Sequence, residues 1–320
     1  MNESAIHSQR DVESGATSIT VELPSNLKRK RKNRTRGRGR GKKANTKQPE
    51  TPEIESKPES RVTTAENENE AQEHQQDSLE SLSLPILPDF DFKEEQLSWS
   101  SESIPKRLQK YWRQRHSLFS RFDDGIKLDE EGWYSVTPEK VAIHCASRCK
   151  ALCAKPEYSP KELVIIDAFC GVGGNSIQFA LAGFKVVSFD IDPLKLTCAK
   201  HNAELYGALE NITFIRGDFL QLACVTKGDI VFLSPPWGGP EYLSHDIFDI
   251  KEMMPIDGEK LFHAASQISK NIMYYMPRNS NLEQLTNLAG LGNICEIEEV
   301  YLNNRAKVLI AYFGSLAIEE

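Results

Sequence analysis

Residues 164–175 read VIIDAFCGVGGN, a short apolar run that ends in an acid and passes into a glycine-rich turn. The apolar run predicts a buried strand that ends at Asp167. Gly171, Gly173 and Gly174 then let the backbone turn tightly and approach a ligand that a Cβ would keep away. The turn lacks the G-x-G-x-x-G spacing of dinucleotide sites, and the preceding acid would repel a pyrophosphate. The stretch therefore predicts a site for the cationic amino-acid end of S-adenosylmethionine, the alternative being a turn that only permits packing.

Further acids follow the next two predicted strands. Asp190 ends the apolar stretch KVVSFD about 20 residues after the glycines, where an acid accepts hydrogen bonds from ribose hydroxyls. Asp192, two residues further on, ranks lower as a ligand. Asp218 follows the third strand and is predicted to accept from an adenine amino group, although such an aspartate is usually only a turn former. Cys170 is expected beside the loop for its small size.

Apolar runs alternate with helical patterns over the rest of the chain. Strands are predicted at Leu163–Asp167, Lys185–Asp190, Ile212–Arg216, Asp229–Ser234, Asn271–Met276, Ile294–Leu302 and Lys307–Phe313. Helices are predicted at Pro105–Phe122, Thr137–Cys153, Asn175–Ala182, Pro193–Tyr206, Gly258–Ser269 and Asn281–Leu288. This alternation predicts a doubly wound α/β fold with helices on both faces of a largely parallel sheet, and seven strands with a final antiparallel hairpin are typical of the Rossmann-like methyltransferase sheet.

Composition divides the chain into three parts. All four Trp lie beyond residue 97, and residues 1–97 hold few long apolar runs. Only the later part can bury enough apolar surface to offset the entropy of ordering the chain. We therefore expect a disordered tail over residues 1–97, a helical extension over residues 98–160 and a methyltransferase domain over residues 161–320. No membrane span or signal peptide is predicted, and the seven Cys are expected to be reduced.

The tail carries two charge blocks that nearly cancel within the net charge of −7. Residues 26–47 hold 12 Lys or Arg and no acid, whereas residues 50–95 hold 14 acids against three bases. A flexible basic block attracts nucleic acid through phosphate contacts and counterion release. The run Lys28–Lys32 also fits a nuclear-import signal. The alternative is a solvated tail that binds nothing specific.

A second motif, SPPWGGP, follows the predicted strand 229–234. Its first four residues match [DNS]-P-P-[YFW] at the carboxyl end of a fourth strand, the edge where ligands bind in such sheets. Because the prolines fix φ, the Ser234 hydroxyl and the Pro235 carbonyl can accept from an –NH₂ group and aim its lone pair at a methyl donor. Trp237 is predicted to stack on the base, and a Trp face suits a cationic base such as 7-methylguanine. The alternative is a Trp that belongs to the core.

Residues 110–313 resemble the trimethylguanosine synthase family of RNA cap methyltransferases. The segments that carry the resemblance are KYW (110–112), LFSRFDDGI (118–126), GWYSVTPEK (132–140), DAFCGVGGN (167–175), SPPWGGP (234–240) and MPRN (276–279). The resemblance implies transfer of methyl groups from S-adenosylmethionine to N2 of 7-methylguanosine, in two steps. The product would be the 2,2,7-trimethylguanosine cap of small nuclear and nucleolar RNAs.

The resemblance also implies roles for individual residues. Lys110 and Arg278 look like the residues that grip the cap phosphates, although each taken alone is more simply a surface charge. Ser234, Pro235 and Trp237 would act at the base, and the extension over 98–160 would contribute to the cap and cofactor pocket. The residues expected to bind the cofactor are Asp167, Cys170, Gly171, Gly173, Asp190, Asp218, Ser135 and Thr137. The low-complexity tail replaces a longer N-terminal extension of some relatives, which puts partner binding in doubt.

The expected partners are capped small nuclear and nucleolar RNAs together with ribonucleoprotein proteins. A monomer located in the nucleus, and also in the cytoplasm, is the expectation. Two other functions remain open: methylation of another planar nitrogen, such as adenine N6 or a protein glutamine amide, and a non-catalytic RNA-binding scaffold. His144, Cys145, Cys149 and Cys153 share a predicted helix, but they read as one helix face and no metal site is predicted.

Overall fold

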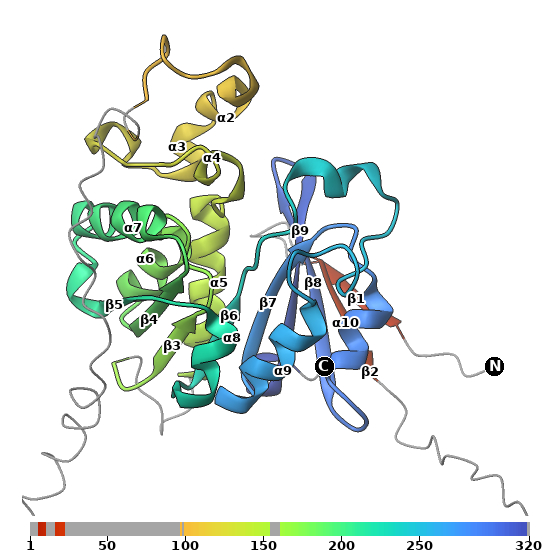
Figure 1. Ribbon diagram of the computed structural model, residues 1–320. Helices are drawn as coiled ribbons and strands as arrows, with labels where there is room; N and C mark the ends of the chain where they lie inside the picture. Colours follow the sequence, from red (N-terminus) through yellow and green to blue (C-terminus); the bar gives the residue numbers. More distant parts are fainter. Residues whose placement is uncertain (1–5, 11–16, 23–96, 98, 154–160, 319–320) are drawn as a thin grey trace, which may run out of the picture. The chain divides into compact units, whose positions relative to one another are not determined.

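The computed structural model describes residues 6–10, 17–22, 97, 99–153 and 161–318 (Figure 1). The strands form one mixed sheet in the order β1-β2-β8-β9-β7-β6-β3-β4-β5. Their bounds are β1 (Ile6–Arg10), β2 (Thr17–Glu22), β3 (Val164–Asp167), β4 (Lys185–Asp190), β5 (Ile212–Arg216), β6 (Ile230–Leu233), β7 (Ile272–Pro277), β8 (Ile294–Leu302) and β9 (Arg305–Phe313).

The strands β3 to β7 pair in parallel, and β9 inserts antiparallel between β7 and β8. The seven predicted strands and the final hairpin are therefore confirmed, with bounds that differ by at most two residues. Because parallel strands end at the same edge, the loops that follow β3, β4 and β6 meet there. Both sequence motifs belong to these loops.

The sheet is longer than predicted, because β1 and β2 come from the segment expected to be disordered. β2 pairs antiparallel with β8, and β1 pairs with β2. A strand at the edge of a sheet presents unpaired backbone groups, which β2 satisfies along β8. The average composition of the tail does not reveal the short run TSITVE, which is rich in the β-branched residues that favour strands. The expectation of disorder is thus corrected for these two strands, and the charge blocks over 26–47 and 50–95 lie outside the described residues.

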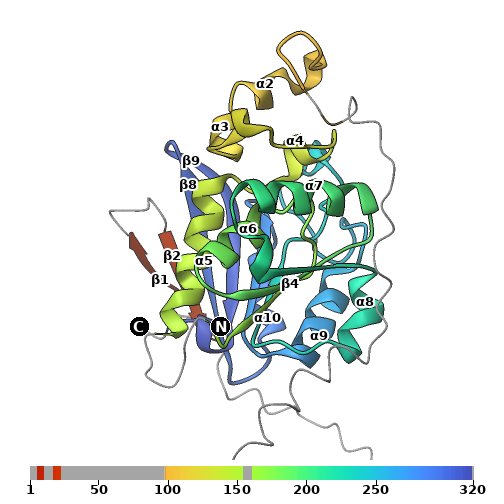
Figure 2. The same cartoon turned by 90° about the vertical axis from the view of Figure 1, so that its left-hand side faces the viewer.

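Helices cover both faces of the sheet, as the predicted doubly wound fold requires (Figures 1 and 2). One face packs against α5 (Glu139–Leu152), α6 (Gly174–Leu181) and α7 (Pro193–Leu205), and the other against α8 (Phe219–Leu222), α9 (Gly258–Ile268) and α10 (Leu282–Leu288). Successive side chains of β7 point to opposite faces of the sheet. Tyr275 packs in the core on the side of α5 to α7, and Tyr274 in the core on the side of α8 to α10.

The extension is built around one buried ring. The continuous helix predicted over Pro105–Phe122 is wrong, since the segment forms α2 (Gln109–Trp112), α3 (Arg115–Leu118) and short 3-10 turns, followed by α4 (Gly132–Ser135). Trp112 and Phe122 both contact the fully buried Trp133, with ring centroids 5.8 and 5.4 Å away. A straight helix would hold positions ten residues apart about 15 Å from each other. The chain must therefore break for both rings to pack on Trp133.

The helix predicted over Thr137–Cys153 is confirmed as α5, which is fastened to the hairpin by buried ion pairs. Arg148 pairs with Glu296, and His144 Nε2 lies 2.8 Å from Glu298. Burial would raise the pKa of Glu298, but His144 and Arg148 outweigh this effect and hold that pKa below its ordinary value. No helix among the described residues is long and apolar enough to cross a membrane.

Candidate active site

The loop between β3 and α6 begins at a buried acid. Asp167 ends β3, is fully buried, and accepts a hydrogen bond from Ser176 Oγ at 2.6 Å. Ser188 Oγ in turn donates to Ser176 Oγ at 2.9 Å. Burial raises the pKa of Asp167 to about 7. Its second oxygen, Oδ1, is buried and has no hydrogen-bond partner among the described residues.

A second acceptor without a donor lies at the other end of this loop. Asn175 Nδ2 donates to Thr137 Oγ1 at 2.9 Å, whereas Asn175 Oδ1 is buried and unpaired within the described part of the chain. Buried acceptors that lack a donor cost free energy, so native proteins seldom keep them. An ammonium group supplies such donors. The residues present therefore fit the amino-acid end of S-adenosylmethionine.

The loop also leaves room for a ligand at one glycine. Gly171 has a φ of +52°, and no heavy atom lies within 4 Å of the position where a Cβ would be. Its N–H donates to Asp190 Oδ2 at 2.9 Å, so the acid at the end of β4 holds the loop in place. Gly173, at φ +92°, serves packing instead, because a Cβ there would lie 3.1 Å from the backbone of Ala199 in α7. The sequence predicted a ligand approach at Gly171, Gly173 and Gly174, and the structure shows that the surroundings of the first two differ.

Three other predicted residues have local structural roles. Asp192 caps α7 by accepting from Leu194 N at 2.8 Å, in agreement with its lower rank as a ligand. Asp218 caps α8 by accepting from Leu220 N at 2.9 Å, so it has the turn-forming role while its contact with adenine stays a prediction. Cys170 packs against α7, and burial raises the pKa of its thiol well above the ordinary value. The thiol is therefore a neutral packing group.

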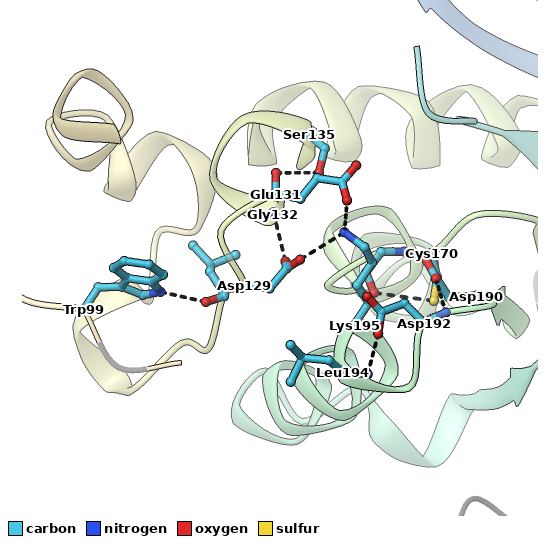
Figure 3. Close-up of polar contacts among 12 residues, drawn as sticks. Trp99, Asp129, Glu131, Gly132, Ser135, Cys170, Asp190, Asp192, Leu194 and Lys195 are labelled. Atoms are coloured by element: carbon cyan, nitrogen blue, oxygen red, sulfur yellow. Dashed lines mark hydrogen bonds and ion pairs between the residues drawn. The ribbon is translucent and has the colours of Figure 1, made fainter. Parts of the chain in front are cut away.

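A buried ion-pair cluster fastens the extension beside the cofactor loop. Lys195 Nζ on α7 lies 3.1 Å from Asp129 Oδ2 and 2.9 Å from Glu131 Oε2. Figure 3 shows the ammonium group between the two carboxylates, next to Cys170 and Asp190. Burial alone would lower the pKa of Lys195, but the two acids outweigh it and raise that pKa. Any shift of the extension would break this cluster.

The segment that begins with the SPPWGGP motif, residues 234–244, follows β6, the strand next to β3, and is called the catalytic loop below. β6 pairs with β3, with Phe232 opposite Asp167. Two residues further on, Ser234 Oγ donates to the carbonyl of Phe169 at 3.3 Å. Pro235 is buried, whereas Pro236 is exposed. The hydroxyl proton of Ser234 is thus donated to the cofactor loop, and the lone pairs of Ser234 Oγ can accept from a substrate amine.

The ring of Trp237 is held by two tyrosines. Tyr275 of β7 stacks on it with centroids 5.7 Å apart and planes at 16°, and Tyr242 meets it edge-on at 5.3 Å. Trp237 is only half-buried, although its Nε1 is buried and unpaired within the described residues. One face of the ring is therefore supported by protein. An aromatic platform of this kind can take a planar base on its other face.

The extension contributes Ser135, Thr137 and Lys110. Thr137 is buried and accepts from Asn175. Burial raises the pKa of Tyr275 and the Thr137 hydroxyl opposes this effect, so Thr137 lies near both the cofactor loop and the ring support. Ser135 is exposed and donates to Glu131 O at 2.9 Å. Lys110 is exposed, with Nζ 4.6 Å from the ring of its neighbour in α2. The structure thus joins Thr137 directly to the predicted site.

Arg278 follows β7 at the same edge. Its Nη1 donates to the carbonyl of Ala306 at 3.3 Å, which brings it to the tip of the β8–β9 hairpin. Burial raises the pKa of Tyr242, and the positive charge of Arg278 opposes this effect. The charge of Tyr111 in α2 also raises the pKa of Tyr242. Asn279 Nδ2 donates to the carbonyl of Tyr242 at 3.1 Å, which joins the segment of Arg278 to the catalytic loop.

Sequence reasoning missed Asn175, Lys195, Tyr242 and Tyr275. Only Asn175 gave a signal, since it directly follows the glycines, whereas the others depend on packing between distant elements. A shallow cavity lined by Leu163, Gly228 and Ser269 lies at the opposite edge, before β3, β6 and β7, and takes no part in this site.

The motifs and their arrangement match known proteins. Residues 162–316 match the family model described as RNA cap guanine-N2 methyltransferase. The chain is 42% identical over 218 residues to the trimethylguanosine synthase of Schizosaccharomyces pombe, covering 66% of this chain and 87% of that protein. The trimethylguanosine synthase of Saccharomyces cerevisiae is 38% identical over 187 residues, 56% of this chain and 58% of that protein. A solved structure of magnesium protoporphyrin IX methyltransferase from Synechocystis PCC 6803 with bound SAM has a TM-score of 0.39 at 17% identity, over 67% of this chain and 100% of that one.

The two sequence motifs thus follow adjoining strands, in a chain that covers 87% of the trimethylguanosine synthase of Schizosaccharomyces pombe. The chain belongs to the RNA cap guanine-N2 methyltransferase family and is an S-adenosylmethionine-dependent enzyme.

Proposed function

We propose that this enzyme methylates N2 of the 7-methylguanosine cap of small nuclear and nucleolar RNAs and yields the 2,2,7-trimethylguanosine cap. One observation carries the proposal: the Ser234 hydroxyl donates to the carbonyl of Phe169, so the amine-binding loop is tied to the cofactor loop. A methyl donor on the first loop and an acceptor nitrogen on the second would meet at this contact.

S-adenosylmethionine supplies a methyl group on a positively charged sulfur. In our proposal Asp167 and Asn175 accept hydrogen bonds from its ammonium group, and Asp190 accepts from the ribose. Ser234 and the Pro235 carbonyl accept from the N2 amine and turn its lone pair toward the methyl group. The new N–C bond forms as the S–C bond breaks, and the extra proton on N2 leaves to water afterwards. Positioning and exclusion of water would supply most of the rate, without a general base.

Trp237 would hold the base. Its ring is supported on one side by Tyr275, and 7-methylguanine would stack on the opposite face. The methylated base carries a positive charge, and attraction between a cation and a Trp face is worth about 0.5–2 kcal/mol. Lys110 and Arg278 would bind the phosphates of the cap from the two sides of this loop. Ser135 and Thr137 would line the cofactor pocket from the extension.

The choice of small nuclear and nucleolar RNAs rests on the resemblance and on the basic block over residues 26–47. That block suits attraction of RNA and import into the nucleus, where the substrates would be bound as ribonucleoproteins. We also propose that the enzyme acts as a monomer.

The test is methyl transfer to three dinucleotides that differ in one base. The enzyme is incubated with labelled cofactor and dinucleotides capped by 7-methylguanosine, unmethylated guanosine or adenosine. We expect label on the 7-methylguanosine cap, at N2. Equal transfer to guanosine would refute the requirement for a cationic base, and transfer to adenosine alone would favour an adenine N6 enzyme. Cofactor binding with no transfer to any of them would favour a scaffold.

A further inference from the structure

Two buried hydroxyls lie in line beneath the cofactor loop. Ser188 Oγ in β4 donates to Ser176 Oγ in α6 at 2.9 Å, and Ser176 Oγ donates to Asp167 Oδ2 at 2.6 Å. Ser188 and Asp167 are direct neighbours in the register of β3 and β4. All three residues are fully buried, with exposed fractions of 0%. The two serines thus form a hydrogen-bonded chain, called the serine relay below, that ends on one oxygen of the acid.

Packing alone does not account for these serines. Ser188 lies two residues after Val186 and therefore points to the same face of the sheet, into the apolar core that α6 covers. Ser176 is followed by Ile177, which belongs to the same core. A buried hydroxyl costs free energy unless it is hydrogen-bonded, and an alanine would fill either position without that cost. The serine relay therefore indicates a role at Asp167 beyond packing.

The relay fixes how the carboxylate presents its two oxygens. Asp167 Oδ2 accepts from Ser176, whereas Oδ1 is buried and has no hydrogen-bond partner among the described residues. Because a carboxylate turns as one plane, holding Oδ2 also holds Oδ1. Oδ1 is the oxygen that the proposed function leaves for the ammonium group of S-adenosylmethionine. An acceptor that is already held in place costs less to order when the ligand binds.

The relay also acts on the charge of Asp167. Burial raises the pKa of Asp167 to about 7, and the Ser176 hydroxyl gives the largest opposing effect. A hydrogen bond donated to a carboxylate favours its ionised form. Ser188 reinforces this bond, since hydrogen bonds in a chain polarise one another. The relay thus favours the charged form of the acid, which is the form that attracts an ammonium group.

The other titratable groups around Asp167 leave this effect in place. Asp190 in β4 raises the pKa of Asp167. The Cys145 thiol in α5 and the Cys170 thiol in the cofactor loop both have a pKa well above the ordinary value, mainly because they are buried and in part because of the charge of Asp167. Both thiols therefore stay neutral between about pH 6 and 8. Asp190 is the acid that remains charged nearby, and it is common to all the variants below.

We propose that Ser176 and Ser188 are positioning residues for the cofactor, which aim the unpaired oxygen of Asp167 at the ammonium group of S-adenosylmethionine and hold the acid ionised for it. The proposal rests on the proposed function, in which Asp167 accepts from that ammonium group. Ser176 acts directly on the acid, and Ser188 acts through Ser176. Loss of Ser176 therefore has the larger effect, and loss of both serines has the same effect as loss of Ser176 alone.

The test measures binding of S-adenosylhomocysteine to the full chain by calorimetry between about pH 6 and about pH 8. Ser176→Ala should move the midpoint of the pH profile upward by about one unit, because the acid then binds its proton more tightly. Affinity should fall about tenfold at about pH 6 but only about twofold at about pH 8, where the acid is ionised again. Ser188→Ala should shift the midpoint less, in the same direction, and Ser176→Thr, which keeps the hydroxyl, should follow the wild type.

The change with pH separates the relay from a purely structural role. A structural defect weakens binding equally at every pH, so equal losses at both ends of the range in Ser176→Ala would overturn the proposal. A wild-type profile in that variant would overturn it too, as would losses that add in Ser176→Ala/Ser188→Ala. Thr286→Val is the matched control, because it removes a buried hydroxyl of α10 that donates to the carbonyl of Glu283. It should keep the wild-type profile.

Asp167→Asn distinguishes failure of the relay from failure of the proposed function. A wild-type pH profile in Asp167→Asn would mean that the acid does not meet the ammonium group, so the proposed contact fails and the relay with it. If Asp167→Asn loses the profile while Ser176→Ala keeps it unchanged, the contact stands and the relay alone is overturned. Loss of the profile in Asp167→Asn together with an upward shift in Ser176→Ala is the result that we expect.

Discussion

Tyr275 lies flat against Trp237, with ring centroids 5.7 Å apart and planes inclined by 16°. Burial raises the pKa of Tyr275 and the nearby Thr137 hydroxyl opposes this effect. Thr137 Oγ1 in turn accepts from Asn175 in the cofactor loop. A continuous line of contacts therefore joins the loop proposed for the cofactor to the ring proposed for the base. Binding of the cofactor and binding of the base are both expected to depend on the position of the short segment before α5.

Replacing Tyr275 by Leu should weaken cap binding while leaving cofactor binding in place. The stacked pair is worth about 0.5–1.5 kcal/mol beyond the buried area, so the cap Kd should rise about two- to twelvefold. Tyr275→Phe keeps the ring and should stay near the wild type. Tyr274→Leu is the matched control, because that buried ring points into the opposite core. Cap and S-adenosylhomocysteine affinities from calorimetry check this, and equal cap losses in both Leu variants would contradict it.

Removing the Trp237 ring should nearly abolish methylation. Stacking on an aromatic is worth about 1–3 kcal/mol per base, and the charge of 7-methylguanine adds about 0.5–2 kcal/mol. Trp237→Ala should thus lose cap binding and keep cofactor binding, and Trp237→Phe should keep partial activity. The wild type should prefer 7-methylguanosine to guanosine by tens-fold at most from stacking. Full activity in Trp237→Ala would make the ring structural and put the base elsewhere.

Replacing Lys195 by Met should loosen the extension. The side chains of Lys195 and Asp129 are 12% and 11% exposed, so the change leaves a nearly buried carboxylate without its cation. Such losses cost about 3–5 kcal/mol, and partial exposure puts this one at the low end. Urea unfolding measures the loss, with Lys200→Met, an exposed position on the same helix, as the control. Similar stabilities for the two variants would show that the cluster contributes nothing to folding.

The strand pattern and both motifs could be predicted because they are local. Asp167, the glycines and Ser234 to Trp237 each sit at the end of an apolar run, and strand ends are readable from one sequence. Their meeting at one edge follows from the parallel sheet. The predicted helix over Pro105–Phe122 failed because the rings converge on Trp133, which lies beyond the segment.

Residues that act through distant partners stayed hidden. Tyr275 looks like any core residue of β7, and Lys195 like any charge on an amphipathic helix. Their roles depend on Trp237 and Asp129, which lie 38 and 66 residues away in the sequence. Gly171 and Gly173 of the cofactor loop are a second example of a feature that the sequence does not reveal. Gly173 faces Ala199, whereas Gly171 faces open space.

Cofactor affinity should depend on pH through Asp167. Burial raises the pKa of this acid to about 7 from an ordinary 3.8, so it binds its proton more tightly in the folded state. Its contribution to stability is therefore present below about pH 4 and is lost as the pH rises through 7. A cationic ligand reverses the preference, because it favours the ionised carboxylate and releases the proton. Affinity for S-adenosylhomocysteine, which keeps the ammonium group, should rise with pH up to about 7 and then level off.

Calorimetry in buffers of different ionisation heat measures this proton directly. Binding should release up to one proton well below pH 7 and almost none at about pH 8. Asp167→Asn should bind more weakly and lose most of this dependence, the remainder coming from Asp190, whose pKa burial also raises. Asp192→Asn removes an acid at the same edge that only caps α7, so it should keep the wild-type profile. Proton release that survives unchanged in Asp167→Asn would mean that another group meets the ammonium, and the unpaired oxygen of Asp167 would need a different partner.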